Sequence, residues 1–327
     1  MKSILTLTLL LSFVGLAFSR NAAAEDSKSA APKGVPAKIQ LPTRDPAKLE
    51  RVAKLGKGPG RENSGIVRSR LQPDLFWIHN DSGDEPRVYA VHADGSDYRS
   101  TREADTPGVL ISGAINVDWE DITVDDEGHL IVGDTGNNGN DRRDLVLYYL
   151  FEPSASAERT TFLKKVFFHY PEQRQFPAPK EDFNYDCEAI FTVDNVVHLI
   201  SKNRSNSLGN LYRLDNPKPD VSNPLTSLES FDFQGKVVGA DASPDGLRLI
   251  VITYESLWYF ERATKKDSFF SGRVSWAPYK SKQIEAVCFA DDKTLLLADE
   301  DLGELFSVAL SEMQVVREVQ RVAKAEK

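Results

Sequence analysis

Residues 120–134 read EDITVDDEGHLIVGD. The stretch consists of an acid, a short apolar run, an acidic turn with a glycine, a second apolar run and a final acid. Two such runs joined by a turn are typical of an antiparallel β-hairpin. Five segments of the chain follow this order, and their leading acids are Glu62, Glu120, Glu188, Asp241 and Glu285.

The repeat has a regular register. In four of the five segments the second strand is expected to end 14 residues after the leading acid, at Asp134, Lys202, Glu255 and Asp299. The first segment has a longer hairpin that ends at Asp81. Each repeat has room for three or four strands, which is typical of propeller blades. We therefore expect an all-β fold, a β-propeller of about five blades (six are possible), each a four-stranded antiparallel sheet.

The N-terminal residues differ in composition from the rest. An apolar run over residues 4–18 precedes small residues at 22–24, an order that predicts a cleavable secretory signal peptide over residues 1–24. An uncleaved anchor is the alternative. Residues 25–48 are rich in Ala, Pro, Lys and Ser and are expected to form a flexible lead-in. Residues 49–327 should then form one propeller domain of a secreted or periplasmic protein.

The chain is acidic, with a formal net charge of −9. Removal of the expected leader, which carries Lys2 and Arg20 and no acid, changes the net charge to −11. Such a surface repels phosphate backbones, so we expect no nucleic-acid partner. We expect instead a small molecule or an extracytoplasmic protein as partner, a monomer, and no transmembrane segment in the mature chain. Cys187 and Cys288 could form a disulfide or remain two buried thiols.

The hairpin geometry predicts where the acids lie. The start of the first strand and the end of the second lie at one edge of an antiparallel blade, and the first strand is innermost in a propeller. One channel rim should therefore gather the following residues, with Lys202 as its one cation: Glu62, Asp81, Glu120, Asp134, Glu188, Asp241, Glu255, Glu285 and Asp299. The leading acids could instead accept backbone N–H bonds from the neighbouring blade.

Two segments depart from the repeat and suggest a metal site. They are HNDSGDE at residues 79–85 and NVDWED at 116–121, the latter with its partner loop GDTGNN at 133–138. Carboxylate and amide oxygens suit a hard divalent cation such as Ca²⁺ better than zinc. The expected metal ligands are Asp81, Asp118, Glu120, Asp134 and Asn137. The same residue types could instead simply build tight Asx turns.

Other residues near these segments are candidates for ligand binding or catalysis. The ligand-binding candidates are Glu62, Asn80, Asp84, Trp119, Glu188, Lys202, Asp241, Glu285 and Asp299, and the catalytic candidates are His79, Asp81 and Glu120. His79 could equally be a structural histidine, and Trp119 could pack between blades. The sequence contains no nucleophile elbow, HExxH, phosphate-binding loop or CxxC motif. We therefore predict a binding or scaffold module, with a metal-dependent hydrolase of an ester, lactone or phosphoester as the alternative.

Four segments carry a resemblance to known families. ENSGI at 62–66, FWIHNDSG at 76–83, NVDWEDI at 116–122 and GDTGNN at 133–138 resemble a family of bacterial secreted propellers. The pattern is similar to the SdiA-regulated and esterase-like-phytase propellers. A phytase-like activity would imply basic residues facing a phosphate, for which the chain offers Lys202, Arg87, Arg142, Arg143 and Arg204.

A more distant resemblance links Glu62 and SPDG at residues 243–246 to the gluconolactonase and regucalcin-like propellers. That resemblance implies one divalent cation held in the channel by a Glu, Asn residues and an Asp. Of these ligands only Glu62 matches.

Overall fold

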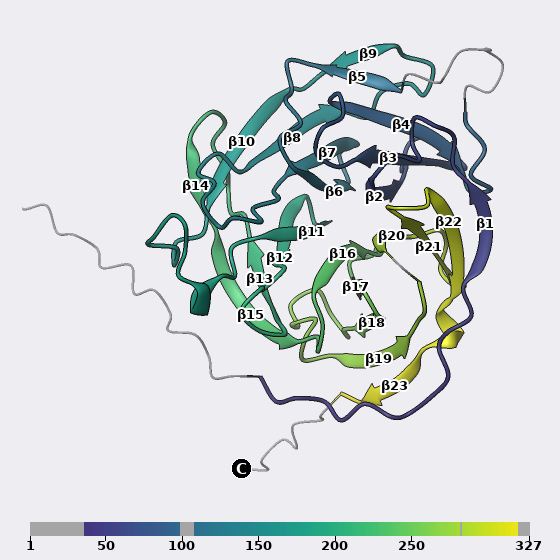
Figure 1. Ribbon diagram of the computed structural model, residues 1–327, viewed down its shortest axis with the longest axis vertical. Helices are drawn as coiled ribbons and strands as arrows, with labels where there is room; N and C mark the ends of the chain where they lie inside the picture. The colour runs from purple at the N-terminus through teal and green to yellow at the C-terminus, as the bar shows by residue number, and fades with distance from the viewer. Residues whose placement is uncertain (1–35, 99–107, 282, 320–327) are drawn as a thin grey trace, which may run out of the picture. The chain divides into compact units, whose positions relative to one another are not determined.

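The computed structural model describes residues 36–98, 108–281 and 283–319. These residues form five β-sheets and two short 3₁₀ turns, η1 (Lys180–Asp182) and η2 (Leu310–Glu312). The sheets surround a central axis, each with one strand at the centre and the others further out (Figure 1). The fold is a five-bladed β-propeller, and the expectation of about five blades is confirmed.

Each blade contains four or five strands, which follow one another from the axis outward. Blade 1 contains β2 (Asn63–Arg68), β3 (Leu75–Asn80), β4 (Arg87–His92), β5 (Val109–Ser112) and β9 (Arg159–Thr161). Blade 2 contains β6 (Trp119–Val124), β7 (His129–Asp134), β8 (Val146–Phe151), β10 (Lys164–His169) and β14 (Ser222–Pro224). Blade 3 contains β11 (Cys187–Val193), β12 (Val196–Ser201), β13 (Leu208–Arg213) and β15 (Thr226–Asp232). Blade 4 contains β16 (Val237–Ala242), β17 (Arg248–Thr253), β18 (Ser256–Glu261), β19 (Arg273–Pro278) and β23 (Gln314–Arg317). Blade 5 contains β20 (Ile284–Phe289), β21 (Thr294–Asp299), β22 (Glu304–Ala309) and β1 (Glu50–Lys54).

Both ends of the described chain take part in closing the ring. Each innermost strand contacts the next one, and β20 of the last blade contacts β2 of the first. Strand β1 supplies the outer strand of blade 5 by pairing antiparallel with β22, and β23 pairs antiparallel with β19 of blade 4 (Figure 1). In addition, β9 and β14 join the outer edges of blades 1 and 2 in parallel, which the repeat did not predict.

The hydrophobic core lies between the blades. The described residues form five clusters of buried apolar side chains, and each cluster joins two adjacent blades. Trp77 and Trp119, for example, pack in the cluster between blades 1 and 2, and both are fully buried. Because each blade shares its core with two neighbours, burial of this apolar surface favours the closed ring over isolated blades.

Residues 36–48 have defined contacts, although we expected the whole segment 25–48 to be flexible. The side chains of Ile39 and Leu41 pack against the core between blades 3 and 4. Gln234 Nε2 donates a hydrogen bond to the Ile39 carbonyl (2.8 Å), and the Ala47 N–H donates to the Pro278 carbonyl (2.7 Å). The expected signal peptide and residues 25–35 lie outside the described residues.

Two further expectations from the sequence can be compared with the structure. Cys187 and Cys288 are both free and buried, and they lie in different inter-blade clusters, so the structure has no bridge between them. Over the described ranges, none of the helical segments has the length and apolar character needed to cross a bilayer.

Candidate metal site at the ring axis

A one-residue register shift occurs near the start of every innermost strand. In blade 2, Trp119 pairs with Asp134 and Asp121 pairs with Gly133, so Glu120 between them has no partner. The corresponding unpaired residues in the five blades are Ser64, Glu120, Glu188, Val238 and Glu285. A bulge of this kind changes the direction of a side chain. Carboxylate oxygens of the three glutamates lie within 4.8 Å of one another although they come from three blades, so the bulged residues converge at the axis.

This register corrects the predicted repeat in two blades. Glu62 lies two residues before the bulged Ser64, is exposed, and has a positive φ of 48°. Asp241 lies three residues beyond the bulged Val238, toward the other end of the axis. The repeat was aligned on acidic residue types, whereas the structure places its bulge on a serine in blade 1 and on a valine in blade 4.

The three glutamates are buried, and one of them, Glu188, is paired with a lysine. Glu120, Glu188 and Glu285 are 3%, 3% and 6% exposed. Lys202 Nζ donates to both oxygens of Glu188 and to the Tyr254 hydroxyl (2.7 Å). Burial raises the pKa of Glu120 and Glu188 well above the ordinary value, and burial together with Glu300 raises that of Glu285 to about 7. Three carboxyl groups at the axis thus face a single ammonium group.

A second group of carboxylates adjoins the first. Oxygens of Asp81, Asp118 and Glu120 lie within 4.8 Å of one another, so Glu120 belongs to both groups. The Asp118 carboxylate makes no hydrogen bond or ion pair with any described residue. A Cβ at Gly136 would collide with oxygens of both Asp118 and Glu120, so this glycine lets the two carboxylates approach its backbone. Burial raises the pKa of Asp81 to about 7 and also raises that of Asp118.

We call Asp81, Asp118, Glu120, Glu188 and Glu285 together the axial acid cluster. Two arginines lie beside it, and each is held mainly by a buried carboxylate outside the cluster. Arg142 Nη1 lies 2.8 Å from Asp134, and Arg204 Nη2 lies 2.6 Å from Asp186 and 3.6 Å from Glu188. The cluster therefore keeps an excess of acidic groups over basic ones.

The other two basic residues named by the phytase-like resemblance have partners elsewhere. Arg87 Nη2 lies 2.7 Å from Glu85, and the Arg143 guanidinium lies 4.0 Å above the Phe176 ring. Both of these partners lie outside the axial acid cluster.

Two of the expected metal ligands have other partners. Asp134 accepts the backbone N–H groups of Val117 and Asp118 (3.2 and 3.1 Å) in addition to Arg142. The Asn137 amide donates to the Tyr185 carbonyl (2.8 Å), and its oxygen accepts two backbone N–H groups of the following loop. Asp134 and Asn137 therefore stabilise the loops around the cluster. Of the five expected metal ligands, Asp81, Asp118 and Glu120 are the three whose oxygens lie close together.

Asp299 has the same structural role in blade 5 that Asp134 has in blade 2. Both pair with the residue just before the bulge, which is Ile284 for Asp299. Asp299 is fully buried and accepts hydrogen bonds from the Leu302 N–H (2.7 Å) and the Ser281 hydroxyl (3.0 Å).

The remaining candidates in the first repeat-breaking segment pack inside the protein. His79 is fully buried, its Nδ1 lies 3.1 Å from the Asn80 carbonyl, and burial lowers its pKa to about 4. Its ring meets the buried Trp119 edge-on, with centroids 5.7 Å apart. The Asn80 amide donates to Asp84 Oδ2 (2.6 Å) and to the Gly58 carbonyl (2.8 Å). These contacts place His79, Asn80, Asp84 and Trp119 in the packing of blades 1 and 2, next to the grouped carboxylates in the sequence but not among the grouped ligand atoms.

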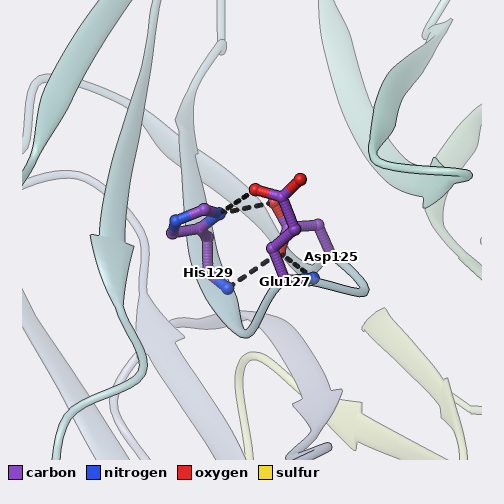
Figure 2. Close-up of side chains that lie close together, drawn as sticks. All are labelled: Asp125, Glu127 and His129. Atoms are coloured by element: carbon purple, nitrogen blue, oxygen red, sulfur yellow. Dashed lines mark hydrogen bonds and ion pairs between the residues drawn. The ribbon is translucent and has the colours of Figure 1, made fainter.

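A third group of potential ligands lies in the turn between β6 and β7. Asp125 Oδ1 accepts the backbone N–H groups of Glu127 (3.0 Å) and His129 (2.8 Å), while its Oδ2 lies 2.7 Å from His129 Nδ1 (Figure 2). This is the bonding pattern of an Asx turn, and it accounts for the grouping without a metal.

Two aspartates join adjacent blades, and from the sequence we considered this role for Asp241, as a leading acid, but not for Asp121. Asp121 accepts the Ile190 N–H of the next blade (2.8 Å), and Asp241 accepts the Phe289 N–H of the next blade (2.9 Å). These are the inter-blade bonds that we considered for the leading acids. Ser64, Tyr254 and Asp186 were missed altogether, because a bulge position or a buried contact has no signature in one sequence.

Comparisons with known proteins found similar solved structures at low identity. No family model and no curated protein sequence matches the chain. Similar solved structures include a hydrazine synthase from Kuenenia stuttgartiensis, with 9% identity, 76% of this chain and 71% of that chain covered, and a TM-score of 0.42. A gluconolactonase-like protein shows 11% identity over 82% of this chain and 93% of its own, with a TM-score of 0.39. A catalytically inactive virginiamycin B lyase from Staphylococcus aureus with quinupristin shows 14% identity over 76% and 66%, with a TM-score of 0.37. These values carry no argument, and the assignment of the fold rests on the strands described above.

Proposed function

We propose that this chain is a binding module that holds a divalent cation at the axial acid cluster. The observation that supports the proposal is the grouping of Asp81, Asp118 and Glu120, since Asp118 has no partner among the described residues. Carboxylates crowded together at a partly buried site repel one another, and a bound cation relieves that repulsion. The secreted or periplasmic location is part of the same proposal.

The chemistry of the donors favours Ca²⁺. The three grouped side chains offer oxygen only, and Ca²⁺ takes six to eight oxygen ligands, whereas zinc prefers nitrogen and sulfur. Three carboxylates leave coordination positions for water or for a bound molecule. Lys202 and Arg204 lie on the Glu188 side of the cluster, where they favour an anionic group on that molecule.

The first prediction concerns metal-dependent stability. At a Ca²⁺ concentration a hundredfold above Kd, binding should stabilise the fold by about 2.7 kcal/mol, which raises Tm by roughly 5–10 °C. Asp118→Asn removes a ligand charge without breaking a hydrogen bond of the described residues, so it should abolish most of this increase. Thermal melts of metal-free protein, with and without Ca²⁺, measure the effect.

Glu127→Gln is the matched control for that experiment. Glu127 is an exposed acid of the other potential ligand group, in the β6–β7 turn (Figure 2), and its change should leave the Ca²⁺ response intact. A wild-type Tm that ignores both Ca²⁺ and chelator would refute the cation site. A response lost in Glu127→Gln and kept in Asp118→Asn would move the site to the turn.

A second candidate function is metal-dependent hydrolysis of an ester, lactone or phosphoester. It is supported by Asp81 and Glu285, whose pKa values burial raises to about 7, where a carboxyl group can act as a general acid or base. A cation beside them would polarise the scissile group or activate water.

The second prediction tests that candidate. Purified protein is assayed on chromogenic esters, lactones and phosphates with Ca²⁺, Mn²⁺ or Zn²⁺, and turnover should require metal. Glu285→Gln should reduce kcat by about 100-fold, as expected for loss of a general acid or base, while Tm still rises with Ca²⁺. No turnover across the whole panel, on protein that binds Ca²⁺, leaves the binding module as the function.

A further inference from the structure

A cavity of about 470 Å³ lies at the opposite end of the ring axis from the axial acid cluster. It is lined by residues at the ends of the innermost strands β2, β6, β16 and β20 and by the turns that follow them. On β20, Glu285 of the acid cluster and Phe289 of the cavity wall are four residues apart, about 13 Å along a strand. The cavity is therefore a separate site from the acid cluster.

The cavity has an apolar wall. Val67, Val124 and Phe289 line it, and each is at most 5% exposed. The volume is in the range of small-molecule sites, and charged side chains line the cavity beside this apolar wall. The Arg248 guanidinium lies 5.7 Å from the centroid of the Phe289 ring, and a planar group of a ligand can pack beside these two groups.

The basic groups of the cavity differ in how they are paired. Arg70 forms an ion pair with Asp126, and Arg248 Nη2 lies 2.7 Å from Asp292. Arg68, the last residue of β2, is exposed, and its guanidinium makes no hydrogen bond or ion pair with any described residue. The chain has a net charge of −9, so acidic groups that could pair with Arg68 are plentiful. Its unpaired guanidinium in the cavity therefore suits an anionic ligand group.

Asp241 supplies a second polar group. Its Oδ2 accepts the Phe289 N–H (2.9 Å), which fixes the carboxyl group in the cavity wall. A carboxyl group has room for further hydrogen bonds beyond this one. The side chain can therefore bond a hydroxyl or amino group of a ligand that lies against Phe289.

We propose that this cavity binds a small aromatic carboxylic acid that also carries a hydroxyl or amino group. The ligand's carboxylate pairs with Arg68, its ring packs against Phe289, and its hydroxyl or amino group bonds Asp241. Arg68 and Asp241 come from blades 1 and 4, so a ligand of this class contacts two blades that are far apart in the sequence.

Calorimetric titration of the full chain with 4-hydroxyphenylacetate tests the proposal. The neutral amide of the same compound reports on the carboxylate, and phenylacetate reports on the hydroxyl group. We expect the acid to bind at least tenfold more tightly than the amide, and Arg68→Gln to lose that preference, since a hydrogen-bonded charge contributes about a ten- to hundredfold effect. Asp241→Asn should reduce the preference for the hydroxylated acid. Arg159→Gln, at an exposed arginine on β9, is the matched control and should bind as wild type.

All titrations are made in excess chelator, so that a failure of the proposed cation site leaves them unaffected. Circular dichroism verifies that each variant is folded. The proposal is overturned if 4-hydroxyphenylacetate shows no saturable binding at millimolar concentration, if acid and amide bind equally, or if Arg68→Gln binds as tightly as wild type.

Discussion

Asp241 and Asp245 of blade 4 lie four residues apart, and their surroundings shift their pKa values in opposite directions. Burial raises the pKa of Asp241 to about 7. Burial also acts on Asp245, but hydrogen bonds from the Ser243 hydroxyl and the Leu247 N–H outweigh it and lower its pKa. Between pH 4 and 7 the folded protein therefore holds a proton on Asp241 that the unfolded chain has released. The stability contributed by that proton is present below pH 4 and is lost as pH rises to 7.

The third prediction follows from this difference. Asp241→Asn keeps an oxygen for the Phe289 N–H and removes the buried charge, so at pH 8 it should stabilise the fold by about 1 kcal/mol or more, or about 2–4 °C in Tm. At pH 4 the gain should vanish, since Asp241 is already protonated there. Asp245→Asn, the control, should destabilise the fold at pH 8. Melting curves at the two pH values measure both, and an equal gain for Asp241→Asn at both would contradict the assignment.

Among the elements, the innermost strands show what one sequence can and cannot predict. Alternating apolar runs and acidic turns were enough to predict hairpins, blades and their number. The position of the bulge could not be predicted in the same way, because the unpaired residue has no fixed type and is Ser64, Glu120 or Val238 in different blades. The leading acid was therefore located correctly in blades 2, 3 and 5, where a glutamate occupies the bulge, and misplaced in blades 1 and 4.

The acids at the ends of the second strands were harder to interpret. Asp134 and Asp299 recur with the expected spacing, yet the structure uses them to hold backbone N–H groups, whereas Glu120 and Glu285 face the axis. Regular spacing therefore located the acids without distinguishing structural from axial ones. The grouping of Asp81 and Asp118 with Glu120 was predicted, because both come from the segments that depart from the repeat.

At the scale of the whole molecule, β1 completes blade 5, the last blade of the ring. It pairs with β22, and Leu55 just after it is buried in the cluster between blades 5 and 1. A chain that begins at residue 55 lacks this outer strand and exposes the edge of blade 5. The fourth prediction is that its Tm falls by about 10 °C or more, a loss of several kcal/mol, while a chain that begins at residue 36 melts like the full chain. Equal melting of the two would show that β1 is dispensable.

The pairing of β1 with β22 also determines when during translation β1 can find its partner. Lys54 pairs with Glu304, 250 residues later in the chain. A ribosome that adds 5–20 residues per second needs roughly 12–50 s to make that length. Throughout this time the first strand of the chain has a hydrogen-bonding edge and no partner, which makes it open to pairing with a neighbouring nascent chain. Blades 1 to 3 can form while the ribosome still works, but blade 5 needs β22 and the outer edge of blade 4 needs β23, so the ring is completed only when the last strands emerge.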